Sequence, residues 1–160
     1  MVSKDIKIKV AESKASFSVK KVGFLNVTGE LSKINGTIHF DPDNLSSSTF
    51  DISVPTATIN TNNEKRDEHL RKEDFFSVEQ YPEITFKSTS VRKANGQFTT
   101  TGNLTLLGVT KAIEIPFTFK DGVFEGNFSL NRLDYALGKK FPAFFIGKTI
   151  NVSIHCKTNL

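Results

Sequence analysis

The chain has 160 residues, of which 38% are hydrophobic and 24% charged, and it carries a formal net charge of +4. That length predicts one domain, residues 1–160, with enough chain to bury a substantial core. The lysines are spread along the sequence with no basic cluster interleaved with aromatic residues, so nucleic-acid binding is not expected and at most a transient membrane contact is.

The cysteine count and the N-terminus bear on where the protein works. Cys156 is the only cysteine, which excludes an intrachain disulfide. No apolar run approaches the length of a membrane span, and residues 1–15 lack the apolar segment of a signal peptide. Two localisations stay open: periplasmic or secreted, if a leader preceded Met1 and was removed, or cytoplasmic.

The aromatic residues are unusual, with 15 Phe, 2 Tyr and no Trp. Phenylalanine has no polar group, so it supplies purely apolar rings to the interior. Such an interior is either a packed core or the wall of an apolar lumen, and composition alone does not choose between them.

Apolar and polar residues alternate along most of the chain, which is typical of half-buried strands. The runs lie at residues 6–10, 17–19, 27–31, 36–40, 50–54, 84–88, 98–106, 113–119, 124–130 and 150–156. Asn95-Gly96 and Asp121-Gly122 predict hairpin turns. We expect an all-β protein with about eight strands. An antiparallel barrel is favoured over a sandwich because closure removes exposed strand edges.

Residues 58–88 depart from this alternation and predict one short helix between mid-chain strands. Thr61 and Glu64 have the spacing of a capping box, which places the helix start between them. Asp67 and Arg71 are one turn apart and are expected to pair on a solvated face. The apolar residues of this segment gather near its C-terminal end, as if it closed one end of the barrel.

The histidines and hydroxyl residues form no catalytic or metal-binding pattern. His39, His69 and His155 lack a recurring ligand spacing, and neither a G-x-S-x-G turn nor a glycine-rich phosphate loop is present. We expect a protein that is not an enzyme and that holds no metal.

Residues 139–147, KKFPAFFIG, form a dense apolar patch between strands. Pro142 with Gly138 and Gly147 argues against a regular helix. Because connections usually lie on the surface, such a patch indicates a portal, a partner contact or a lid. The alternative is that these rings cap the barrel as additional core.

Several blocks of residues resemble the motifs of one family. They are Thr61, Arg66-Asp67-x-His69-Leu70, Asp74-Phe75-Phe76, Tyr81-Pro82-x-Ile84-x-Phe86-x-Ser88, Gly102-x-Leu104-Thr105-x-x-Gly108-Val109-Thr110-Lys111, Phe17-x-Val19 with Gly23 and Val27-x-Gly29, and Arg132-x-Asp134-Tyr135. Together they resemble the YceI-like family of lipocalin-like, polyisoprenoid-binding proteins. The chain departs from the pattern at Lys21, where many members have His, and at Ala136-Leu137.

The resemblance implies an eight-stranded antiparallel lipocalin-like barrel that holds a long apolar chain. The implied ligand is an isoprenoid quinone, another polyisoprenoid or a fatty-acyl amide, with no other cofactor, and many members are exported to the bacterial periplasm. The helix would lie over one end of the barrel. Four shared polar residues are expected to anchor it, or alternatively to contact a lipid head group: Arg66, Asp67, His69 and Asp74.

From the shared strand faces and this resemblance we expect a non-catalytic protein that transports or sequesters a long-chain lipid. The expected lumen residues are Phe17, Val19, Phe40, Phe50, Ile52, Phe86, Phe98, Leu104, Phe117, Phe119, Phe124 and Phe128. Phe76, Phe144 and Phe145 are expected at the mouth. The alternative is a stress-related interaction module with a packed barrel, acting through its surface or as a homodimer joined by residues 141–146.

Overall fold

The computed structural model describes residues 5–22 and 25–160; Gly23, named in the resemblance, lies outside them. The strands are β1 (Asp5–Ile6), β2 (Lys14–Lys21), β3 (Leu25–Ser32), β4 (Asn35–His39), β5 (Thr49–Pro55), β6 (Glu83–Ala94), β7 (Gln97–Leu106), β8 (Val109–Lys120), β9 (Val123–Asn131) and β10 (Ile146–Lys157). The helix α1 is Glu64–Leu70, and the short 3-10 turns are η1 (Val10–Glu12), η3 (Leu45–Ser47), η4 (Thr56–Thr58) and η5 (Arg132–Tyr135).

The ten strands form one antiparallel sheet in the order β1-β4-β5-β6-β7-β8-β9-β10-β2-β3. The expected antiparallel, barrel-like fold with one helix is confirmed, although the strands number ten instead of about eight. The expected strand at residues 6–10 is wrong in its extent, because only Asp5–Ile6 pairs as a strand and the chain turns into η1 at Val10.

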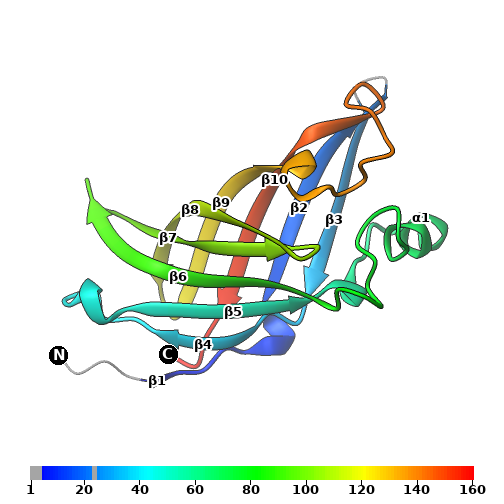
Figure 1. Ribbon diagram of the computed structural model, residues 1–160. Helices are drawn as coiled ribbons and strands as arrows, with labels where there is room; N and C mark the ends of the chain where they lie inside the picture. Colours follow the sequence, from blue (N-terminus) through cyan, green and yellow to red (C-terminus); the bar gives the residue numbers. More distant parts are fainter. Residues whose placement is uncertain (1–4, 23–24) are drawn as a thin grey trace.

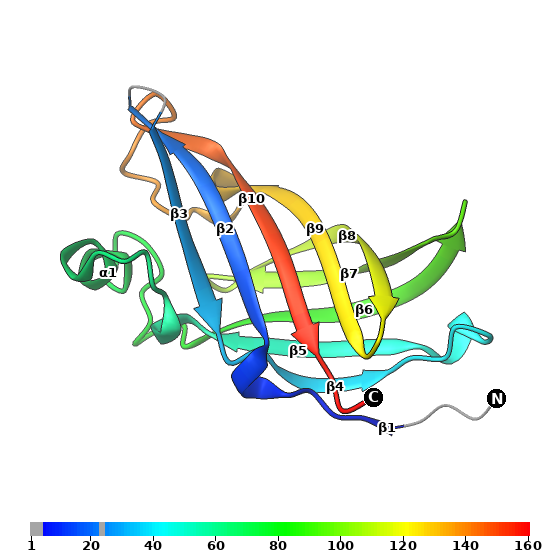
Figure 2. The same ribbon diagram turned by 180° about the vertical axis from the view of Figure 1, so that it is seen from behind.

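The sheet curls until its two ends approach each other, as the two opposite views show (Figures 1 and 2). Along this seam Glu30 of β3 and Asn60 form an isolated antiparallel bridge, each donating its backbone N–H to the other's carbonyl at 2.9 Å. The Ser32 N–H donates to the Thr58 hydroxyl at 3.0 Å nearby. The described part of the chain therefore forms a barrel closed by a few contacts along this line, with no full strand ladder there.

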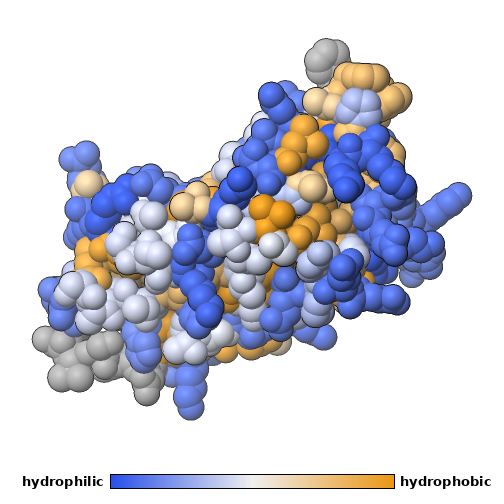
Figure 3. Space-filling view, in the orientation of Figure 1, coloured by the Kyte–Doolittle hydropathy of each residue, from blue (hydrophilic) through white to orange (hydrophobic). Residues whose placement is uncertain are grey.

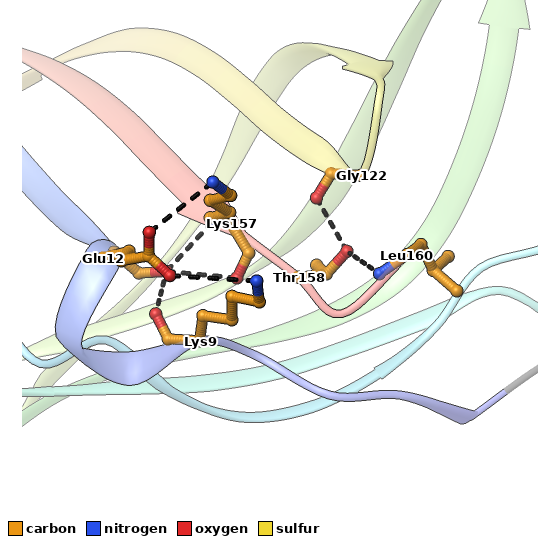
Figure 4. Close-up of polar contacts among 7 residues, drawn as sticks. Lys9, Glu12, Gly122, Lys157, Thr158 and Leu160 are labelled. Carbon is orange, nitrogen blue, oxygen red and sulfur yellow. Dashed lines mark hydrogen bonds and ion pairs between the residues drawn. The ribbon is translucent and has the colours of Figure 1, made fainter.

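The chain's last residues tie the lower end of the barrel together (Figure 4). The Lys9 N–H donates to the Lys157 carbonyl at 2.7 Å, and the Thr158 hydroxyl donates to the Gly122 carbonyl at 2.7 Å. Glu12 lies 4.0 Å from Lys9 and 3.5 Å from Lys157 at exposed positions, where ion pairs contribute little. Hydrogen bonds to backbone carbonyls are therefore the main link between β10, the N-terminal segment and the β8–β9 turn.

A cluster of phenylalanine rings fills part of the interior. The Phe40 ring lies 5.2–6.3 Å, between centroids, from the five other members of the cluster. Most of these pairs are edge-to-face, the arrangement that aromatic rings favour in cores. The members are Phe40, Phe50, Phe98, Phe117, Phe119 and Phe124.

The N-cap of α1 lies two residues later than the capping-box pattern suggests. Asn63 is the N-cap, and its side-chain oxygen accepts the Arg66 N–H at 3.0 Å. The expected capping role of Thr61 is wrong, because its backbone N–H and its hydroxyl both donate to the Asp67 carboxylate. The expected pairing of Asp67 with Arg71 is also wrong: Asp67 is buried, and the Arg71 guanidinium donates to two backbone carbonyls instead.

Candidate functional site: an apolar cavity beside the helix

A cavity with a volume of about 510 Å³, which we call the main cavity, lies inside the barrel at the end nearer α1. β2, β3, β5, β6, β7, β9 and β10 supply its wall, and the segments around α1 and before β10 supply its rim. Its apolar lining is Ala15, Phe17, Val19, Val22, Val27, Leu31, Ile34, Ile52, Val54, Leu70, Phe75, Phe76, Ile84, Phe86, Leu104, Leu106, Phe128, Leu130, Leu137, Phe141, Phe145, Ile146, Ile150, Val152 and Ile154. The few polar residues include Arg66, His69 and Arg132.

Two glycines make room for the rings on this wall. A Cβ at Gly102 of β7 would lie 2.5 Å from the Phe86 ring, and one at Gly29 of β3 would lie 2.6 Å from the Phe17 ring. A side chain at either position would clash with the ring unless the ring moved, so each glycine leaves room for a phenylalanine.

A second, smaller cavity of about 110 Å³ lies deeper in the barrel. It shares Ile34, Ile52, Phe86, Leu104, Phe128 and Ile154 with the first. The phenylalanine cluster supplies its far wall through Phe50, Phe117 and Phe124. The hollow interior therefore narrows toward the cluster, which fills the barrel beyond it.

The structure divides the expected lumen residues into three groups. Phe17, Val19, Ile52, Phe86, Leu104 and Phe128 line the main cavity, and Phe50, Phe117 and Phe124 line the smaller one. Phe40, Phe98 and Phe119 line neither cavity, because they pack against other rings of the cluster. Of the twelve expected lumen residues, nine therefore line one of these two cavities and three pack inside the barrel.

The expected mouth residues also divide. Phe76 and Phe145 line the main cavity, whereas Phe144 lies outside it with 75% of its surface exposed.

Arg66 and Asp67, two of the four polar residues shared with the family, fix the start of α1. The Arg66 guanidinium donates to the Thr61 hydroxyl and carbonyl, both at 2.8 Å. Asp67 accepts from Thr61 on the other side, so the three residues form one hydrogen-bonded unit. These contacts are structural, and Arg66 also reaches the cavity wall.

The other two shared polar residues, His69 and Asp74, belong to a set of contacts that crosses the rim of the cavity. Asp74 lies between His69 Nε2 at 3.2 Å and Lys140 Nζ at 2.8 Å. The Phe75 and Phe141 rings stack at 5.1 Å with an angle of 11° between their planes, and the His69 ring packs edge-on against Phe75. We call His69, Asp74, Phe75, Lys140 and Phe141 the rim clamp, because they join the α1 segment to the segment before β10.

Charge pairing within the rim clamp shifts two ionisation equilibria. The Lys140 ammonium, and then His69, hold the pKa of Asp74 below its ordinary value. Asp74 in turn raises the pKa of Lys140. Opposite charges favour each other's ionised form, so Asp74 and Lys140 are both charged at neutral pH.

Arg132, the first residue of η5, belongs to one of the blocks that carry the family resemblance, but the sequence analysis gave it no role in the site. It is 2% exposed, and its guanidinium donates five hydrogen bonds at 2.6–3.0 Å. All five acceptors are backbone carbonyls of residues 137–147, and burial lowers its pKa. Because a guanidinium has five N–H groups, none is left for a ligand. Arg132 therefore holds the rim segment in place.

Sequence reasoning also missed much of the cavity wall. Ile150, Val152 and Ile154 of β10 share one strand face and all line the main cavity. The period-two alternation that assigns them to one face was the signal that could have found them. The expected lumen residues were mostly phenylalanines, so these three aliphatic residues of β10 were left out.

The described residues contain no group of three or more His, Cys, Asp or Glu side chains that could hold a metal ion. Among the same residues, no helix has the length and apolar character needed to cross a membrane. What this interior offers chemically is an apolar surface with few polar groups, and its charged side chains come from residues near the rim.

A curled antiparallel sheet around an apolar cavity is the architecture of a lipocalin-like barrel. The YceI-like domain model matches residues 7–158, and the chain belongs to that family. Curated relatives include a UPF0312 protein of Vibrio parahaemolyticus, 38% identical over 71% of this chain and 61% of its own length. Protein YceI of Salmonella arizonae is 37% identical over 62% of this chain and 52% of its own. The chain thus spans about half to three-fifths of these relatives' length.

Solved structures share the fold. The Burkholderia cenocepacia protein BcnA superposes with a TM-score of 0.86 at 21% identity, covering 93% of this chain and 98% of that one. The Campylobacter jejuni YceI protein gives 0.75 at 28% identity, covering 88% and 90%. A polyisoprenoid-binding domain from Saccharophagus degradans gives 0.72 at 13% identity, covering 96% and 97%.

Proposed function

We propose that this protein binds the hydrocarbon chain of an isoprenoid or acyl lipid in its main cavity and carries or sequesters it without chemical change. The observation that carries the proposal is the cavity itself, about 510 Å³ in volume and walled almost entirely by apolar side chains. Small-molecule sites commonly span roughly 300–1,000 Å³. Membership of the YceI-like family and the polyisoprenoid binding named for the Saccharophagus degradans domain support the same ligand class.

The lining explains how such a ligand would gain affinity. Each buried CH₂ group contributes about 0.8 kcal/mol, and apolar walls supply this without a specific polar partner. About ten buried groups give roughly 8 kcal/mol, or gross micromolar affinity, before the cost of ordering the chain. The phenylalanine cluster sets the depth of the cavity, so chain length is selected there. A polar head group would remain at the rim, near His69 and Arg66.

Native mass spectrometry of protein taken directly from cells tests the proposal. We expect an added mass of a few hundred daltons that organic extraction removes, and the extracted protein should rebind geranylgeraniol or palmitoylethanolamide supplied in detergent. Comparing these two probes separates isoprenoid from fatty-acyl amide ligands. Protein without added mass that also fails to take up either probe would refute the proposal.

A matched pair of variants locates the binding. Val152→Asp places a carboxylate on the cavity wall, whereas Asn151→Asp places one at the exposed neighbouring position. Burying an unpaired charge against a hydrocarbon is so unfavourable that uptake should fall by at least ~100-fold for the first variant and stay unchanged for the second. Val152→Phe, which narrows the cavity without adding charge, covers the case in which Val152→Asp does not fold. Unchanged uptake in folded Val152→Asp would place the ligand elsewhere.

The alternative expectation was a packed barrel that acts through its surface or as a dimer. Clean apo mass together with concentration-dependent dimers would favour it over lipid carriage.

A further inference from the structure

Four apolar side chains are exposed together where the β2–β3 connection meets the segment before β10. Phe144 is 75% exposed, Leu25 65%, Phe145 48% and Val22 47%. We call these four residues the apolar tip. In Figure 3 hydrophobic residues gather at this end of the molecule and continue toward the centre of the same face.

The apolar tip is held together by local contacts. The Val22 N–H donates to the Phe145 carbonyl at 2.9 Å, which joins the two segments. A turn in which Phe145 and Ile146 both donate to the Pro142 carbonyl presents the rings, and the Phe144 and Phe145 centroids are 4.7 Å apart. The exposed rings therefore project from a defined scaffold.

Lysines surround the apolar tip without neighbouring carboxylates on the same segments. Lys20, Lys21, Lys139, Lys140 and Lys148 are all exposed. Residues 17–22, 25–29 and 136–149 contain no Asp or Glu. Within the described chain, Lys140 alone of the five is in an ion pair, with Asp74. The tip is thus an apolar patch on segments whose charged residues are all lysines.

The tip is also continuous with the main cavity. Val22, Phe145 and Lys21 line the cavity, while Phe144 and Leu25 extend the apolar surface outward from it. A hydrocarbon chain leaving the cavity at this point would remain against apolar side chains.

We propose that the apolar tip docks on the surface of an anionic lipid bilayer, with the aromatic rings at the boundary between head groups and acyl chains and the lysines against the head groups. Apolar side chains flanked by lysines are the combination that binds anionic interfaces. A second copy of the chain fits this surface poorly, because a symmetric contact would bring the lysines of both copies together. Four side chains also fall short of the roughly 800 Å² per partner of a stable interface.

The purpose of docking, transfer of a lipid between bilayer and cavity, rests on the proposed function, but the docking itself does not. The test is co-sedimentation with vesicles of phosphatidylcholine and phosphatidylglycerol in equal parts, compared with phosphatidylcholine alone. We expect binding to the mixed vesicles that weakens with added salt. Phe144→Asp should reduce the partition coefficient at least ~10-fold, since it removes a ring from the interface and adds a repelled charge.

Matched controls lie at the opposite end of the barrel. Val10→Asp makes the same kind of change at an exposed apolar residue of η1, and Lys120→Glu matches Lys139→Glu at the far turn. Lys139→Glu should weaken binding about 5-fold or more, and both controls should leave it unchanged.

Three results would overturn the docking proposal. They are an absence of vesicle binding, equal losses in tip and control variants, or concentration-dependent dimers that Phe144→Asp abolishes. Val152→Asp separates the two proposals, because it should lose lipid uptake and still bind vesicles.

Discussion

Replacing Arg132 by lysine should loosen the rim of the cavity while leaving its charge in place. The wild-type guanidinium donates five hydrogen bonds to the carbonyls of the segment before β10. A lysine ammonium has three donors, so at least two of these carbonyls lose their partner in a buried environment. Each lost bond costs about 1–1.5 kcal/mol, which gives about 2–3 kcal/mol in total.

Urea and thermal unfolding followed by circular dichroism measure this cost. For a chain of this length the expected fall in melting temperature is about 5–10 °C. Hydrogen exchange should localise the effect, with faster exchange at residues 138–146 and unchanged exchange in the β6–β7 ladder. Arg92→Lys is the matched control, because Arg92 is half exposed and donates to side chains on the sheet surface.

Two outcomes would refute this reasoning about Arg132. One is an Arg132→Lys variant as stable as the wild type, which would mean that the carbonyls find other donors. The other is an equal loss in Arg92→Lys, which would mean that burial is irrelevant to the effect.

Three further changes test particular contacts. Ala136 has a left-handed backbone with φ 57°, so Ala136→Gly should stabilise the protein by about 0.5–1 kcal/mol in urea unfolding, and a loss would show that the methyl group packs usefully. Because the pKa of Asp74 is lowered, its stabilising charge is present above the ordinary aspartate pKa and lost as the pH falls through the depressed value; hydrogen exchange at residues 138–146 should accelerate on that acidification in the wild type and not in Asp74→Asn. Burial raises the pKa of Cys156 to about 11, so iodoacetamide at pH 8 should label it only after unfolding, and rapid labelling of folded protein would contradict its burial.

Much of the barrel could be predicted because period-two alternation is a local property of the sequence. The runs in β5, β7 and β9 place Phe50, Leu104 and Phe124 on interior faces, and all three are buried. The β1 region failed because Ile6, Ile8 and Val10 continue the alternation while the backbone leaves the sheet. A tertiary contact, the bridge from Ile8 to Thr158, decides the path there, and no local pattern encodes it.

The division of the interior into hollow and filled parts could not be predicted. Phe40 and Phe86 have equivalent patterns in the sequence, yet Phe40 packs among rings while Phe86 lines the cavity. The difference depends on what lies opposite each residue across the barrel, which follows from the curl of the whole sheet. The role of Gly102 in making room for Phe86 can be inferred only when the pairing of β6 with β7 is known.

The helix start shows how a side chain can satisfy a local rule and still act elsewhere. Thr61 and Glu64 have capping-box spacing, but Asn63 lies closer to the helix and takes the capping role. Thr61 then bonds Asp67, which is buried against it. Thr61 and Asn63 both have side chains that can cap a helix, so the spacing of Thr61 and Glu64 alone could not identify the N-cap.

Few hydrogen bonds hold the barrel closed along the seam. Around the rest of the curled sheet, neighbouring strands are joined by pairs of hydrogen-bonded residues, as in β9 with β10. At the seam, the described residues show hydrogen bonds between Glu30 and Asn60 and between Ser32 and Thr58. Under the proposed function, a ligand wider than a straight hydrocarbon, such as a methyl-branched chain, would separate the barrel wall along the seam. That separation would break a few hydrogen bonds and no complete strand ladder.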